Sequence, residues 1–111
     1  MNRSLISDIS MDCVIRFNKW DEKGKKPILG NATGGLSGPC IKPIALKAVY
    51  HVAQKTTIPI IGCGGIMDYR DVLEFLASGA SAVQVGTANL IDPCICKKII
   101  TGLKTYYGKK N

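Results

Sequence analysis

The sequence predicts an α/β fold in which short parallel strands alternate with helices. Three observations support this: two largely apolar, β-branched runs of strand length, a glycine-bearing loop after each run, and a helix-length amphipathic segment between them. The runs with their loops are Ile58–Ile66 and Ala82–Ala88. In a (β/α)8 barrel, the loops after the last two strands bind a phosphate group. We therefore expect the C-terminal third of a (β/α)8 barrel with a phosphorylated ligand.

The length of the chain sets how much of a barrel it can form. It has 111 residues, whereas a complete barrel needs about 250. Three strand-and-helix units are the most that fit. We divide the sequence into residues 1–25, a diverged or irregular N-terminal segment, and residues 26–111, the C-terminal part of the barrel.

The N-terminal elements are short. Leu5–Ile6 and Cys13–Ile15 are candidate strands, and Asn18–Lys26 is polar and contains Gly24, which predicts a loop or hairpin tip. Asn31–Pro39 contains too many glycines for a regular element. We predict a long loop there, and such loops on rigid scaffolds often carry ligand contacts.

The first predicted helix covers Pro43–Lys55, because proline suits the first helical turn. Its apolar residues recur at i, i+3, i+4 and i+7, which predicts one buried face made of Leu46, Val49, Tyr50 and Ala53. The strand Ile58–Ile61 follows. It is wholly apolar, which predicts burial on both faces.

The second predicted helix covers Asp68–Ser78. Asp68 supplies an N-cap acceptor, and Gly79 stands where a left-handed residue closes a helix. The buried stripe is predicted to contain Val72, Leu73, Phe75 and Leu76.

After the second helix we predict a strand at Ala82–Val85, a short helical turn at Thr87–Ile91 and a third helix at Lys97–Tyr107. The residues predicted to share one face of the last helix are Cys96, Ile99, Ile100, Leu103 and Tyr107.

Composition excludes several classes of partner. The net charge is +7, but the lysines are scattered and form no clustered stripe, so we expect no nucleic-acid partner. No run of 18 apolar residues occurs, and no secretory signal is visible, so we expect no membrane span. Five cysteines without a C-x-x-C, beside one histidine, predict no metal site and reduced thiols in the cytoplasm.

Three segments together resemble a known family. They are Gly34–Leu46, Ile58–Ile66 and Gly79–Asn89. Their order and spacing closely resemble the C-terminal part of the dihydroorotate dehydrogenases, and more narrowly the catalytic subunits of the NAD-linked class 1B form. The resemblance covers Lys26 to Tyr107. A single glycine loop is a weak signal, but the loops combined with Leu36–Pro39 are specific.

The resemblance implies a (β/α)8 barrel with FMN at its C-terminal mouth, which oxidises dihydroorotate to orotate in pyrimidine biosynthesis. Electrons would pass through a separate subunit with FAD and an iron–sulfur cluster to NAD, and the protein would be an oligomer. Gly38 would approach the ribityl-phosphate end of FMN, Gly64 and Gly65 would contact the phosphate, and Gly86 with Thr87 would complete the cradle. The strand ends predict the last four independently.

The sequence departs from the family in ways that affect catalysis. The family's active-site base is a cysteine in an earlier part of the barrel, and none of the five cysteines here matches it. The family's substrate-binding Asn-Thr pair is also not visible. We therefore assign no catalytic residue and expect the isolated chain to be inactive. The alternative is a non-catalytic barrel fragment that self-associates or complements a missing part.

Overall fold

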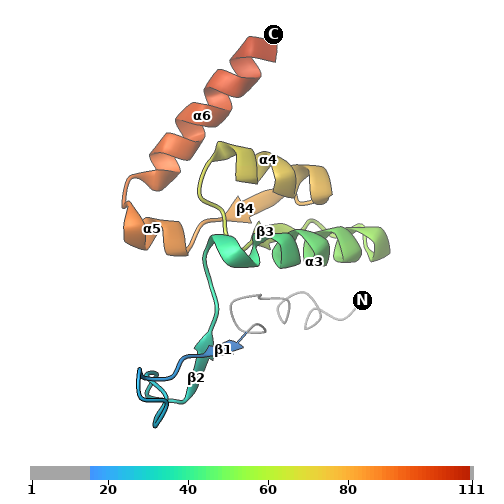
Figure 1. Cartoon of the computed structure of the whole chain (residues 1–111). Coiled ribbons are helices and arrows are strands. Elements are labelled where there is room, and N and C mark those ends of the chain that lie inside the picture. Colours follow the sequence, from blue (N-terminus) through green and yellow to red (C-terminus); the bar gives the residue numbers. More distant parts are fainter. Residues whose placement is uncertain (1–15, 111) are drawn as a thin grey trace.

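The computed structural model describes residues 16–110, and its centre is a small parallel sheet with helices packed on it (Figure 1). The candidate strands Leu5–Ile6 and Cys13–Ile15 lie outside the described residues. The elements in chain order are β1 (Arg16–Asn18), β2 (Thr33–Gly35), the 3-10 helix η1 (Pro39–Ile41), α3 (Lys42–Lys55), β3 (Ile61–Cys63), α4 (Tyr69–Ser78), β4 (Ala82–Gln84), α5 (Thr87–Ile91) and α6 (Ile95–Lys110).

Strands β3 and β4 pair in parallel, and α4 is the crossover between them. Ile61 lies opposite Ala82, and Cys63 lies opposite Gln84. Two parallel strands require a crossover connection, which is usually a helix. The predicted α/β arrangement with parallel strands and packed helices is confirmed.

Strand β3 begins later than predicted, because only Ile61 of the predicted range Ile58–Ile61 belongs to it. Pro59 has no N–H to donate to a ladder. Pairing with the next strand begins at Ile60, whose carbonyl accepts hydrogen bonds from the N–H groups of Ser81 (2.8 Å) and Ala82 (3.4 Å). The strand therefore continues into the glycine segment that was predicted to be a loop.

The parallel sheet is covered on one face only. Gly62 is buried against Phe75, and a Cβ at this glycine would lie 2.5 Å from the Phe75 ring. On the opposite face Ile61 is 58% exposed, and Ala82 and Gln84 are exposed too. The predicted burial of this strand on both faces is therefore wrong, because within residues 16–110 the helices pack on one side of just two strands.

The core lies between α3, α4 and the covered face of the sheet. Its buried members are Ala45, Val49, Ile60, Ile66, Val72, Phe75, Ala80 and Ile99. Leu46 and Ala53 pack against this core as predicted, but Tyr50 is 54% exposed. Tyr50 lies beyond the edge of the stripe, because Ala45 and Val49, one helical turn apart, set the buried face of α3.

Helix α4 begins and ends where the sequence predicts. The Asp68 carboxylate accepts hydrogen bonds from the N–H groups of Arg70 and Asp71, and the Asp71 side chain accepts in return from the Asp68 N–H. This is a capping box, with Asp in place of the usual Glu or Gln. Gly79 closes the helix in the left-handed conformation with φ of 118°. Helix α5 also has its predicted bounds.

Helix α6 is longer than the predicted range Lys97–Tyr107, and its buried face differs from the predicted one. Ile99 is buried, Ile95 and Leu103 pack on the core, and a Cβ at Gly102 would lie 2.6 Å from the Tyr69 ring. This close approach sets which face is covered, and it leaves exposed three residues of the predicted face: Cys96, Ile100 and Tyr107. No helix among residues 16–110 is long and apolar enough to cross a membrane.

Strands β1 and β2 form an antiparallel ribbon that projects away from the helices (Figure 1). The prediction that Asn31–Pro39 holds no regular element is therefore wrong at Thr33–Gly35. Two glycines weaken a strand, but β1 supplies the ladder, and the Arg16 guanidinium donates to the Thr33 carbonyl (3.1 Å) and hydroxyl (3.2 Å). Cross-strand side-chain bonds of this kind offset the cost of glycine.

Candidate functional site

A small open pocket lies at the C-terminal ends of β3 and β4. Its lining consists of Gly38, Cys63, Gly64, Gly65, Ile66, Met67, Gly86, Thr87 and Ala88. All five residues predicted as the cofactor site are in this lining: Gly38, Gly64, Gly65, Gly86 and Thr87. The fold brings them together from three segments that are well separated in the sequence. Cys63 is the last residue of β3, a position that suits a small side chain.

None of the described residues that line the pocket has a charged side chain. Their polar groups are backbone amides and carbonyls, the Thr87 hydroxyl and the Cys63 thiol. Backbone N–H groups that face a concave site can bind an anion without a cationic side chain. An anionic group in this pocket would therefore have to be held mainly through backbone hydrogen bonds and the Thr87 hydroxyl.

The glycines of the pocket serve two different purposes. At Gly38 and Gly86, an added Cβ would meet no atom within 4 Å, so the space beside the backbone is open. At Gly64, a Cβ would lie 2.7 Å from the Ala45 Cβ, and at Gly65 it would lie 2.8 Å from the Gly38 carbonyl oxygen. The absence of a side chain at Gly38 and Gly86 leaves this space open, and glycine at Gly38 also allows a positive φ of 98°. At Gly64 and Gly65 glycine allows close packing.

The rim of the pocket is tied together by two hydroxyl groups. The Thr87 Oγ1 lies 2.8 Å from the Ser37 Oγ, which joins the segment before η1 to the start of α5. Sequence reasoning included Ser37 in the Leu36–Pro39 motif but did not single it out. Ser37 directly precedes the predicted site residue Gly38, and this position could have indicated that its hydroxyl lies at the pocket.

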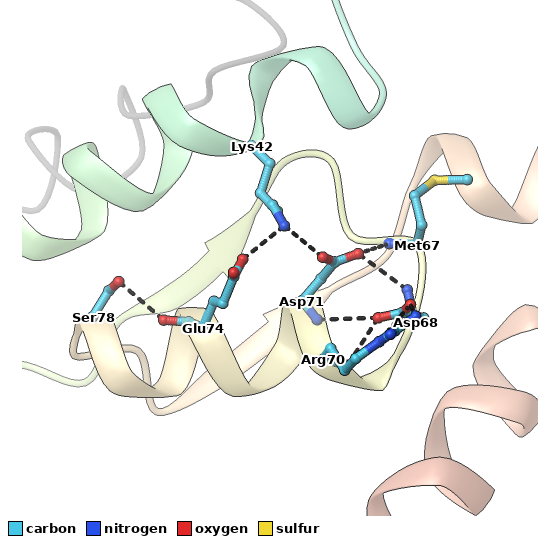
Figure 2. Close-up of polar contacts among 7 residues, drawn as sticks. All are labelled: Lys42, Met67, Asp68, Arg70, Asp71, Glu74 and Ser78. Atoms are coloured by element: carbon cyan, nitrogen blue, oxygen red, sulfur yellow. Dashed lines mark hydrogen bonds and ion pairs between the residues drawn. The ribbon is translucent and has the colours of Figure 1, made fainter.

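A network of charged side chains surrounds the turn between β3 and α4 (Figure 2). The Lys42 Nζ lies 2.7 Å from Asp71 Oδ1 and 2.7 Å from Glu74 Oε2. The other oxygen of Asp71 accepts hydrogen bonds from the N–H groups of Met67 (2.8 Å) and Asp68 (3.2 Å). The hydrogen bond to Asp71, followed by that to Glu74, raises the pKa of Lys42 above its usual value.

Sequence reasoning missed Lys42 and Asp71. The Asp-x-x-Asp spacing at positions 68 and 71 was a visible signal of a capping box. The Lys42 contact joins residues 29 positions apart, and nothing in the sequence indicates it.

Arg70, in the first turn of α4, is also paired with a carboxylate. The Arg70 guanidinium donates to Asp68 Oδ2 at 2.8 Å, and this hydrogen bond is the main cause that lowers the pKa of Asp68. Both Lys42 and Arg70 are therefore directed to carboxylates. The charge of an anion in the pocket would be stabilised by backbone dipoles.

Comparison with known proteins identifies the family. The model of the family described as dihydroorotate dehydrogenase matches residues 2–106. The chain belongs to the dihydroorotate dehydrogenase family. The matched range starts upstream of Lys26, where the resemblance seen in the sequence begins.

Individual relatives carry one shared description, "Dihydroorotate dehydrogenase B (NAD(+)), catalytic subunit". The Petrotoga mobilis protein is 58% identical over 90 residues, which cover 81% of this chain and 30% of that protein. The Fusobacterium nucleatum protein is 60% identical over 89 residues, which cover 80% of this chain and 29% of that protein. The Malacoplasma penetrans protein is 54% identical over 91 residues, which cover 82% of this chain and 30% of that protein. The chain thus matches just under a third of the length of these relatives.

Proposed function

We propose that the chain is the FMN-phosphate-binding, C-terminal third of a (β/α)8 barrel in a dihydroorotate dehydrogenase. The observation that carries the proposal is the convergence of Gly38, Gly64, Gly65, Gly86 and Thr87 on one pocket at the ends of two parallel strands. Phosphate groups bind at this end of barrel strands. FMN is the cofactor that the resemblance to the dihydroorotate dehydrogenases implies, and membership of that family supports the choice.

The residues of the pocket fit a phosphate group. Open space beside Gly38 and Gly86 leaves room for it, and no acidic side chain among the described lining residues would repel it. Backbone N–H groups and the Thr87 hydroxyl would hold its oxygens. Bound flavin would supply the two-electron acceptor for the reaction, while the residues of this chain would bind and orient its phosphate end.

The barrel itself is supported by the open face of the sheet. Ile61, Ala82 and Gln84 point to the side that no described helix covers. In a (β/α)8 barrel, helices form the outer ring and this opposite face is filled by side chains of the other strands. Relatives about three times as long as the matched segment have enough chain to supply those strands.

For the whole protein we propose oxidation of dihydroorotate to orotate in pyrimidine biosynthesis. The words "NAD(+)" and "catalytic subunit" in the description of the relatives support a separate electron-transfer subunit. We propose, as the family resemblance implies, that this subunit carries FAD and an iron–sulfur cluster and that the whole protein is an oligomer. Among the described residues, Cys40, Cys63, Cys94 and Cys96 form no disulfide, which supports a cytoplasmic location, where thiols stay reduced.

A second candidate is a non-catalytic fragment that self-associates or complements a missing part. Among the described residues β3 pairs only with β4, and an open strand edge recruits another chain. The exposed side chains of Ile58 and Ile61 also favour association.

A chimeric protein tests the first proposal. We call it the completed barrel: this chain joined to the part of the Petrotoga mobilis relative that precedes the matched segment. We expect it to retain FMN through desalting and to bind FMN more tightly than riboflavin, which lacks the phosphate. Equal affinity for the two flavins would show that the pocket does not recognise a phosphate.

A further inference from the structure

The turn of residues 64–68, between β3 and α4, supplies much of the pocket lining. Lys42 packs closely against the start of this turn, since a Cβ on Gly65 would lie 2.9 Å from the Lys42 Cβ and 3.0 Å from the Lys42 backbone nitrogen. The Lys42 ammonium also lies 2.7 Å from the carboxylate of Asp71, in the first turn of α4 (Figure 2). Lys42 is therefore linked to the close of the turn through Asp71.

Asp71 connects that ammonium to the backbone of the turn. One carboxylate oxygen accepts from Lys42, and the other accepts from the N–H groups of Met67 and Asp68. The Asp71 side chain is only 15% exposed, so its charge depends on these donors for compensation. Hydrogen bonds to an ionised group are stronger than neutral ones, and removing one partner of a partly buried pair leaves the other uncompensated.

We propose that Lys42 and Asp71 are positioning residues of the pocket, whose ion pair fixes the 64–68 turn in the conformation that binds a phosphate group. The inference rests on the proposed function of the pocket. Neither residue belongs to the pocket lining. They act through the backbone of the turn, in which Gly64 and Gly65 both have positive φ angles, of 134° and 74°.

Glu74 provides a matched control for this pair. Its carboxylate also lies 2.7 Å from the Lys42 ammonium, but its side chain is 51% exposed. Its side chain makes no hydrogen bond to the turn among the described residues. Glu74→Gln thus removes one ion pair of Lys42 and leaves the contacts of the turn in place.

The affinities of the completed barrel for FMN and riboflavin test the inference. We expect Lys42→Met to weaken FMN binding by about tenfold or more, which corresponds to about 1.4 kcal/mol, and to leave riboflavin binding nearly unchanged. Lys42→Arg should restore most of the FMN affinity, because it keeps the charge-assisted bond. Asp71→Asn should reproduce the loss and serves as the second variant where Lys42→Met does not fold. Glu74→Gln should have little effect.

The outcomes separate this inference from the proposed function. FMN affinity that is unchanged in Lys42→Met and Asp71→Asn overturns the positioning role, and so does an equal loss for both flavins, which indicates a general effect on the fold. Equal binding of FMN and riboflavin by the unaltered protein overturns the phosphate pocket itself. A loss confined to FMN, restored by arginine, supports both.

Discussion

Gly65 lies in the proposed phosphate pocket, and its lack of a side chain is explained by close packing of the backbone. The family resemblance places Gly65 against the phosphate, so a side chain here would be expected to fill phosphate space. The structure directs a Cβ there toward the Gly38 carbonyl and the backbone of Lys42. Because Gly38, on the other side of this contact, also lines the pocket, a displaced Gly65 changes two parts of the lining at once.

We therefore expect Gly65→Asp to abolish FMN retention by the completed barrel and also to lower its thermal stability. The backbone at φ of 74° is strained for any L side chain, and the Cβ clash adds to that strain. The measurement is flavin absorbance after gel filtration, together with a thermal melt. Gly65→Ala should lose flavin as well, since the Cβ alone makes the clash. Retention of flavin by either variant would contradict the assignment of this turn.

A substitution at Gly86 should weaken FMN binding without the loss of thermal stability expected at Gly65. An added Cβ meets no atom within 4 Å there, so Gly86→Asp should leave the melting temperature nearly unchanged while its carboxylate repels the phosphate and weakens FMN binding. Gly86→Asn separates charge from size. Gly30→Asp is the matched control, because Gly30 is equally open and lies outside the pocket lining. Similar FMN affinities for Gly86→Asp and Gly30→Asp would place the phosphate elsewhere.

At the scale of elements, the N-terminus of α4 couples helix stability to the pocket turn. The Asp68 carboxylate accepts from the N–H groups of Arg70 (2.9 Å) and Asp71 (3.3 Å). We expect Asp68→Ala to destabilise the completed barrel by about 0.5–2 kcal/mol, the usual cost of losing an N-cap. Chemical denaturation at neutral pH measures this, with Asp68→Asn as a variant that keeps the acceptor.

The same cap gives a pH dependence with a defined sign. The Arg70 guanidinium is the first cause that lowers the pKa of Asp68 below the model-compound value of 3.8. A group with a lowered pKa in the folded state stabilises the fold above its unfolded pKa, and this contribution is lost as the pH falls through the folded pKa. The stability difference between the unaltered protein and Asp68→Asn should therefore shrink below pH 3.8. A difference that stays constant as the pH falls well below 3.8 would contradict the ionic contribution.

The elements that the sequence predicts well are those with local signals. The caps at Asp68 and Gly79 define α4, and Pro43 marks the first turn of α3. The strand before the pocket and the buried face of α6 depend on contacts between distant residues, such as Gly62 on Phe75 and Gly102 on Tyr69. Periodicity alone does not contain those contacts, so it did not predict that β3 continues into Gly62 or which face of α6 is buried.

In the predicted site, too, local sequence signals were sufficient for some residues and contacts between distant residues were needed for others. Strand ends followed by glycines identify Gly64, Gly65, Gly86 and Thr87 as neighbours, since the ends of parallel strands meet at one edge of a sheet. The contact of Lys42 with Asp71 requires α3 and α4 to be packed side by side, and that arrangement is a property of the fold.

At the scale of the whole molecule, the described chain is an open structure. Its radius of gyration is 16.4 Å, whereas a compact domain of this length has about 13 Å. The ribbon of β1 and β2, which projects away from the helices (Figure 1), contributes to this difference. The uncovered face of the parallel sheet and the exposed Leu90 and Ile91 of α5 leave apolar surface in water. Burial of little apolar surface offsets less of the entropy of ordering a chain, so we expect the isolated chain to have low stability.

We therefore expect the isolated 111-residue chain to show no dihydroorotate oxidation and no stably bound flavin. The pocket offers a few backbone hydrogen bonds, each worth about 0.5–1.5 kcal/mol net, against an association cost of at least about 4 kcal/mol. The open edge beside Ile61 also favours aggregation. The test is to purify the chain, add excess FMN, desalt, and record flavin absorbance and orotate formation. Stoichiometric flavin, or turnover above a flavin-only control, would show that the pocket binds without the rest of a barrel.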